Sequence, residues 1–182
     1  MPIYFVVFVI FLGFVYVVIP IFYSYDKSKI EKTLCNNQNI ECLIRGKVNY
    51  SFYPTPRIKI KDLIINDVFE KKNTLATVKD ATIKLSIKNL LVKEKHKFKR
   101  VKLNNFEINV NLKNFKKYKN IITKEIDFIP TTFTKGQIIF FNGKDYVATI
   151  NDTNLNLKLK QYSKEAVLKG KFLNDNILHC FK

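Results

Sequence analysis

Residues 106–112 read FEINVNL, and apolar and polar side chains alternate there without exception. The same alternation occurs in 57–61 (RIKIK), 82–88 (TIKLSIK) and 154–160 (NLNLKLK). Because successive side chains of a strand point to opposite faces, each segment predicts a β-strand with one apolar and one polar face. Further strands are predicted at 137–141, 146–150 and 166–172, with Asn142-Gly143 as a hairpin turn. The chain after residue 40 is therefore expected to be mainly β and predominantly antiparallel.

A sheet with one apolar face must cover that face or provide it with a ligand. A closed sandwich covers it with a second sheet. A curled, open sheet leaves an apolar groove, which an acyl chain can fill because it supplies a continuous apolar surface. The alternation alone leaves both architectures open.

Helical signals are few and short. Ser24 or Asp26 is placed to cap a short helix through Ile30 and Leu34, which the polar sequence CNNQN at 35–39 would end. Weaker helical patterns lie at 89–91 and 115–122. We expect helices to contribute little to the domain.

The first 25 residues contain no charged side chain, and residues 3–19 are apolar or aromatic except for Gly13. With the continuation to Tyr23, this run reaches the roughly 20 residues that a membrane-spanning helix needs. No basic residue precedes it, and bulky side chains close it, so it does not have the pattern of a cleaved signal peptide. We expect a transmembrane anchor at 1–25, a short helix and connection at 26–39, and one β domain at 40–182.

The chain of 182 residues is strongly basic, with 32 Lys and Arg against 15 Asp and Glu and a net charge of +17. Between Lys84 and Lys124 there are 13 basic and two acidic residues. This excess favours anionic partners such as acidic lipid headgroups, lipopolysaccharide or nucleic acid. Lys27, Lys29 and Lys32 follow the predicted span, which favours a cytoplasmic domain by the positive-inside rule.

The three cysteines are Cys35, Cys42 and Cys180. Cys35 and Cys42 can form a disulfide between the helix and the first strand in an oxidising compartment, and free buried thiols are an equal alternative. The spacing predicts no metal site, because neither His96 nor His179 has a second ligand at a suitable distance.

Residues 44–67, IRGKVNYSFYPTPRIKIKDLIIND, and 75–112, LATVKDATIKLSIKNLLVKEKHKFKRVKLNNFEINVNL, resemble the start of the AsmA family of bacterial envelope proteins. The first segment places a Gly, a Pro-x-Pro bend, an alternating strand and an Asp-Leu pair in the family's order. The matching positions there are Gly46, Ser51, Pro54, Pro56, Ile58, Ile60, Asp62, Leu63, Ile65 and Asn66. In the second segment they are Ala76, Ile83, Leu85, Leu90, Leu91, Val101, Leu103, Phe106, Ile108 and Val110. The resemblance covers about residues 1–120 and includes the preceding apolar segment and short helix.

The resemblance implies a protein anchored in the inner membrane of Gram-negative bacteria, with its bulk in the periplasm. It implies a curled sheet that forms an open hydrophobic groove, as in chorein-type bridge lipid-transfer proteins, and a role in phospholipid transport to, or assembly of, the outer membrane. Its expected partners are phospholipid, the inner membrane and other envelope proteins, with no cofactor and no nucleic acid. This periplasmic placement opposes the positive-inside rule.

Two sets of residues would carry this function. The predicted groove lining is Ile58, Ile60, Ile83, Leu85, Ile87, Val101, Leu103, Phe106, Ile108 and Val110. The residues predicted to meet headgroups or a membrane surface are Lys84, Lys88, Lys93, Lys95, Lys97, Lys99, Arg100 and Lys102. Family members are generally several times longer, and about eight strands spaced ~4.8 Å apart extend only about 35 to 40 Å. We therefore expect this chain to be a fragment or one segment that works beside partners.

Three other functions compete with lipid transport. A structural envelope protein with a closed core would bind partners through the edges of its sheet. A nucleic-acid-binding protein would use the basic stretch with Phe98, Phe106, Phe115 and Tyr118, but no recognition motif accompanies them. An enzyme is the poorest fit, since the sequence contains no nucleophile elbow, phosphate loop or metal quartet.

Overall fold

The computed structural model describes residues 2–18, 26–35, 40–51, 55–85, 98–118, 129–160, 163–173 and 175–181. Its main element is a nine-stranded sheet with the order β1-β3-β4-β5-β6-β7-β8-β9, in which β2 also pairs with β3. The strands are β1 Cys42–Ile44, β2 Val48–Ser51, β3 Arg57–Asn66, β4 Thr74–Leu85, β5 Phe98–Asn111, β6 Thr131–Asn142, β7 Asp145–Lys160, β8 Ser163–Phe172 and β9 Asp175–Phe181. The domain is mainly β, as predicted.

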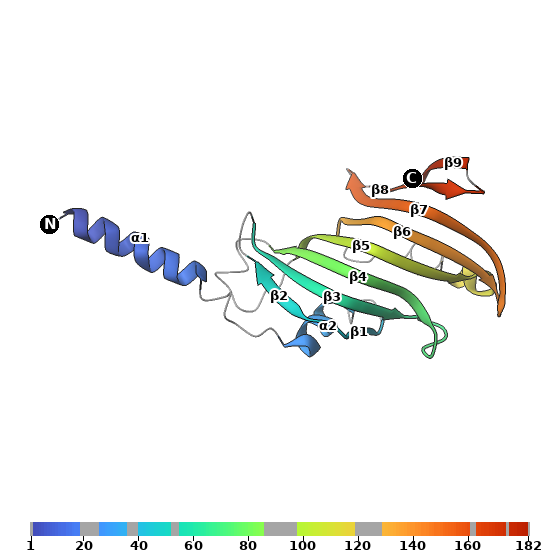
Figure 1. The fold of residues 1–182 in the computed structure, drawn as a ribbon, viewed down its shortest axis with the longest axis horizontal. Helices are drawn as coiled ribbons and strands as arrows, with labels where there is room; N and C mark the ends of the chain where they lie inside the picture. The colour runs from blue at the N-terminus through green and yellow to red at the C-terminus, as the bar shows by residue number, and fades with distance from the viewer. Residues whose placement is uncertain are drawn as a thin grey trace.

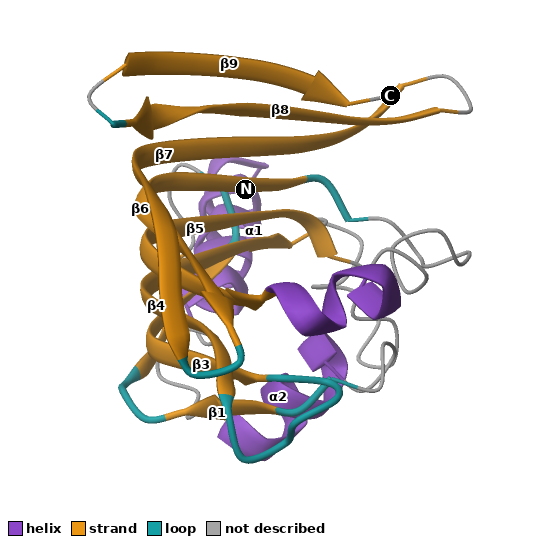
Figure 2. Ribbon diagram, turned by 90° about the vertical axis from the view of Figure 1, so that its right-hand side faces the viewer, coloured by secondary structure: helices purple, strands orange, loops and turns teal. Residues whose placement is uncertain are grey.

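The sheet is open, with β1 and β2 at one edge and β9 at the other. Figure 1 shows the long strands running side by side, and Figure 2 shows them stacked as a single layer. β7 packs extensively only against β6 and β8 among the described elements, and β9 only against β8. The described strands therefore do not form a closed sandwich.

The sheet is predominantly antiparallel, as predicted, and one described strand pair departs from this arrangement. β5 and β6 pair in parallel, with Val101 opposite Thr131 and Ile108 opposite Ile138. A parallel pair requires a crossover that returns the chain to the starting end of the sheet. Residues 112–130 make this crossover, and its described part begins with a 3-10 helix at Leu112–Asn114 and a helical turn at 115–118.

The predicted hairpin near residue 142 is confirmed, but its turn lies one residue later. Asn142 and Asp145 form the last pair of β6 and β7, so the turn consists of Gly143 and Lys144. Gly143 has φ +73°, which glycine adopts without steric cost. The two strands predicted at 146–150 and 154–160 are one long strand, β7.

The N-terminal helix α1 spans Pro2–Val18, and its side chains from Ile3 to Val15 are exposed. Within the residues that the structure describes, no helix is both long and apolar enough to cross a membrane. The rest of the predicted anchor, residues 19–25, lies outside the described residues.

The second helix, α2 (Lys27–Cys35), covers the apolar face of the sheet near β1. Asp26 caps it by accepting a hydrogen bond from the Ser28 N–H at 3.0 Å, as predicted. Ile30 is 7% exposed and joins the core with Ile44 and Ile58. The Cys35–Cys42 disulfide, with Cα atoms 6.0 Å apart, fixes the end of α2 to β1. This settles the alternative that the sequence left open between a disulfide and free thiols.

We predict that replacing both disulfide cysteines by serine lowers the free energy of unfolding by about 2–3 kcal/mol, because the unfolded chain is no longer crosslinked. Denaturant unfolding measures this loss, and hydrogen exchange should accelerate at the Ile44 N–H, which donates to Glu31 Oε1. Cys180→Ser is the matched control, because Cys180 is exposed and free. Equal stability of the double variant and this control would contradict the prediction.

The β3–β4 connection is held against the crossover by a buried polar network. Asp67, 6% exposed, accepts hydrogen bonds from the Phe69 N–H and from the Tyr118 hydroxyl. Asn114 donates to Glu70 Oε1 at 3.1 Å, and the rings of Phe69 and Tyr118 lie 5.3 Å apart. Burial, and then the hydrogen bond and charge of Asp67, raise the pKa of Tyr118 above its ordinary value. The hydroxyl therefore stays protonated and donates at neutral pH.

We predict that Tyr118→Phe lowers the free energy of unfolding by about 1–3 kcal/mol, because it leaves an oxygen of buried Asp67 without this partner. The wild type should also lose stability as pH rises above about 10, where unfolded tyrosine ionises and folded Tyr118 does not. Tyr118→Phe lacks that contribution, so the difference between the two proteins should shrink with rising pH. Tyr146→Phe, at a residue 64% exposed, is the control. A constant difference across this pH range would show that Tyr118 does not titrate as proposed.

Candidate functional site

The apolar face of the sheet consists of cross-strand rows that continue through most of the strands. One row joins Ile58, Ile83, Val101, Thr131, Leu157 and Ala166, and the next joins Ile60, Ala81, Leu103, Phe133, Leu155 and Leu168. We call the face that carries these residues the inner face and the opposite one the outer face. The alternation in each strand produces this continuity, because paired residues point to the same side.

The predicted groove residues all belong to this face where they are described, but they differ in accessibility. Five of them are buried in a packed core, with exposed fractions of 0–5%: Ile58, Ile60, Ile83, Leu103 and Phe106. Four are partly buried against that core: Leu85, Val101, Ile108 and Val110. Ile87 lies outside the described residues. An acyl chain could reach the five buried side chains only if the segments that cover them moved.

The inner face continues onto β6 to β9, which the predicted set of groove residues did not include. Phe133, Phe140, Ile150, Leu168 and Ile177 are only partly buried. No described helix packs extensively on β7, β8 or β9, whereas α2 lies at the β1 edge (Figure 2). The alternation at 154–160 and 166–172 could have placed these strands in the candidate site, because it has the same period as that of β3 to β5.

The outer face carries those residues of the predicted headgroup set that the structure describes. Lys84, Arg100 and Lys102 lie on it, and exposed Lys99 occupies the register shift between Arg100 and Phe98. Lys88, Lys93, Lys95 and Lys97 lie outside the described residues. Two basic residues that were not predicted, Arg57 and Lys59, stand beside them on β3.

A row of polar residues crosses the middle of the sheet and changes which residues face inward. Asp62, Asn105, Lys135 and Asp152 have φ of 48–57°, a left-handed conformation that Asn and Asp tolerate better than most residues. At each of these residues, the inward-facing positions of the strand switch between even and odd residue numbers. Ile58 and Ile60 face inward before Asp62, and Leu63 faces inward after it. The row therefore bends four long strands at one level without turning their apolar side chains outward.

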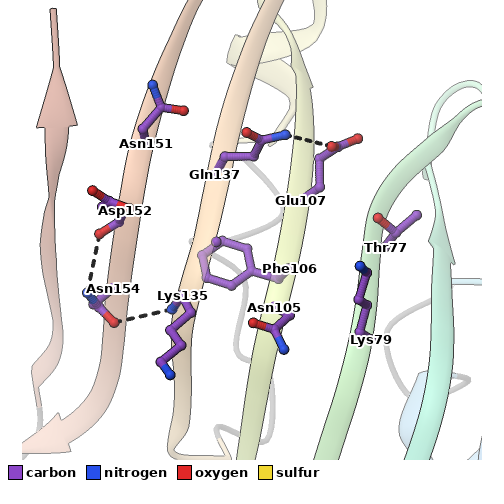
Figure 3. A pocket seen from close by; sticks show the side chains of 11 residues that line it. Thr77, Lys79, Asn105, Phe106, Glu107, Lys135, Gln137, Asn151, Asp152 and Asn154 are labelled. Carbon is purple, nitrogen blue, oxygen red and sulfur yellow. Dashed lines mark hydrogen bonds between the residues drawn. The ribbon is translucent and has the colours of Figure 1, made fainter. Parts of the chain in front are cut away.

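The bend leaves a hollow of about 760 Å³ on the outer face, shown in Figure 3. Gln137 donates to Glu107 Oε2 at 2.7 Å, and Asn154 accepts from the Lys135 N–H at 3.4 Å. Phe106 is the one large apolar side chain in the lining, and it is only 3% exposed. Because all the other side chains of the lining carry polar groups, this hollow is not suited to an acyl chain.

No cluster of three or more metal-ligating side chains occurs among the described residues. Comparison of the chain with protein-family models, with curated proteins and with solved structures finds no match. The resemblance to the AsmA family therefore remains a prediction from the sequence.

We predict that Gly136→Ala destabilises the sheet by about 1–3 kcal/mol, because a Cβ at this position would overlap the ring and the carbonyl oxygen of Phe106. Denaturant unfolding measures the change. Gly13→Ala is the control, since its Cβ would meet nothing within 4 Å. If both variants unfolded at the same denaturant concentration as the wild type, close packing at the bend would not be required.

Proposed function

We propose that the chain binds acyl chains of phospholipids on the partly exposed inner face of β6 to β9. The observation that carries this proposal is the continuation of the apolar rows beyond the packed core onto strands that no described helix covers. Apolar surface in water costs about 25 cal/mol per Å², so an acyl chain that excludes water from this face binds favourably. Following the AsmA resemblance, we propose that the protein takes part in lipid transport to, or assembly of, the outer membrane.

We further propose that α1 and the residues after it attach the protein to the inner membrane, with the sheet in the periplasm. The helix is apolar on all sides and exposed, and such a helix requires an apolar environment. The Cys35–Cys42 disulfide favours an oxidising compartment over the cytoplasm. It thus supports the periplasmic placement against the positive-inside rule.

A structural envelope protein with a closed core is the second candidate, and the burial of Ile83 and Ile60 favours it. Both candidate functions are consistent with the buried core of β3 to β5. They differ at β6 to β9, where only the lipid-binding function requires lipid on the inner face. Nucleic-acid binding is less well supported, because Phe106 is buried and the ring of Tyr118 packs against Phe69, so of the aromatic residues predicted to stack on bases only Phe115 is largely exposed among the described ones.

We expect a photoreactive amino acid at Ile150 or Leu168 to crosslink to phospholipid in membranes of cells that express the protein. The matched outward controls are Thr149 and Lys169, the neighbours of these residues on the same strands. Mass spectrometry of the adducts should show at least a tenfold excess at the inward positions. Ile83 tests the covered half of the face and should give no adduct.

Equal labelling of inward and outward positions, or no labelling at any of them, would contradict acyl-chain binding. The second result would favour the structural envelope protein. Labelling at Ile83 as well would extend the lipid-binding face to β4 and show that the core opens.

A further inference from the structure

Basic side chains on the outer face lie directly opposite one another on three neighbouring strands. Lys84 on β4 pairs with Arg57 on β3 and with Arg100 on β5. In the next outward row, Lys59 and Lys102 flank Thr82 from its two sides. We call Arg57, Lys59, Lys84, Arg100 and Lys102 the cationic patch.

This arrangement is unfavourable for the isolated sheet. Residues directly opposite in a sheet have Cβ atoms roughly 4.5–5.5 Å apart, and like charges at that distance are destabilising. Ion pairs in the described part of the chain involve Lys61, Lys71 and Lys171, and none includes Lys59, Lys84, Arg100 or Lys102. Four cations of the patch, Lys59, Lys84, Arg100 and Lys102, therefore lie close together on the outer face, and no described ion pair includes them.

The rest of the outer face does not share this pattern. Lys61 lies opposite Asp80 and forms an ion pair with it, and Lys158 lies opposite Glu165. Lys171 forms an ion pair with Asp152 at 3.0 Å. A generally Lys-rich composition would not by itself place bases opposite acids at some levels of the sheet and opposite bases at one end of three adjacent strands. The contrast indicates a partner that supplies negative charge to the patch.

We propose that the cationic patch docks the sheet onto an anionic phospholipid surface. The position between Lys59 and Lys102 is occupied by Thr82, and the next strand continues the row with Thr132, so no aromatic side chain is present there to stack on a base. Adjacent strands present a broad face, which suits a membrane surface. Figure 1 shows α1 beyond the end of the sheet at which β3 begins and β4 ends, and the patch lies near that end.

This proposal is independent of acyl-chain binding, because it concerns the opposite face of the sheet. If the cationic patch docks onto the membrane, the ends of β3 to β5 that carry it lie at the membrane surface. β9 lies at the opposite edge of the sheet from β1. The first residues to meet a lipid headgroup would then be those of β3 to β5.

The test uses the full chain in lipid nanodiscs, with Cys180→Ser and a fluorophore on Thr82→Cys. Quenching by lipids that carry a spin label on the headgroup reports contact with the membrane surface. We expect quenching in discs that contain phosphatidylglycerol and little in discs of phosphatidylcholine alone. It should decrease at about 1 M salt, where the Debye length falls to about 3 Å.

The decisive comparison is between two triple variants of equal charge. Lys59, Lys84 and Lys102 changed to Gln should lower the ratio of docked to free sheet by about fivefold per residue, roughly a hundredfold in total. The control changes Lys72, Lys116 and Lys144 to Gln; these are exposed and lie outside the patch, and docking should be unchanged. Circular dichroism melting of both variants checks that the sheet is folded.

Equal quenching in both lipid compositions, or equal effects of the two triple variants, would overturn the proposal. A third result would reassign the patch: if the patch variant lost binding to a mixed-sequence oligonucleotide and kept disc docking, the patch would be a nucleic-acid surface. If Ile150 gave no lipid crosslink while the sheet still docked onto the discs, acyl-chain binding would be refuted and docking through the cationic patch would stand.

Discussion

The structure depends on the need to remove one apolar face of a single-layer sheet from water. Every described strand from β3 to β8 contributes inward apolar side chains, yet the described helix α2 covers the face only near β1. Burial therefore falls along the sheet, from Ile83 at 0% exposed in β4 to partly buried Leu168 in β8. The same construction produces a packed core at one end and a partly exposed apolar face at the other. A functional interpretation of the fold must explain both ends.

The row of polar residues that crosses the middle of the sheet is a second constraint, and it follows from the first. Long strands must bend to curl an open sheet, and a bend that changed side-chain parity in one strand alone would expose its apolar residues. Here the change occurs at the same level in neighbouring strands, at Asp62, Asn105, Lys135 and Asp152. Gly46 extends the row to the β1 edge, where a Cβ would overlap Lys61, and its N–H donates to the Lys61 carbonyl oxygen at 3.2 Å. Concerted bending keeps the inner face continuous.

Strict alternation was sufficient to predict the strands and the faces of Ile58, Ile83 and Ile108, because a strand has no other period. Local chemistry gave Ser24 or Asp26 as the cap of α2, and Asp26 accepts the capping hydrogen bond. The bend was missed although its signal is visible: two adjacent polar residues interrupt the alternation in KD at 61–62, NN at 104–105 and ND at 151–152. The parallel β5–β6 pair was missed because strand pattern does not encode direction. The length of the segment at 112–130 was the available evidence for a crossover.

Accessibility could not be predicted from the pattern, because the same alternation serves a packed core and an open face. Ile60 and Leu168 occupy one cross-strand row, but Ile60 is 1% exposed whereas Leu168 is only partly buried. What covers a residue depends on contacts distant in sequence, such as that of Ile30 with the sheet. The grouping of the cations depends on strand register. Lys84 belongs to a cationic patch only because the strand pairing places Arg57 and Arg100 on either side of it. A basic composition predicts attraction to anions, and strand pairing selects the few cations that can act together on one surface.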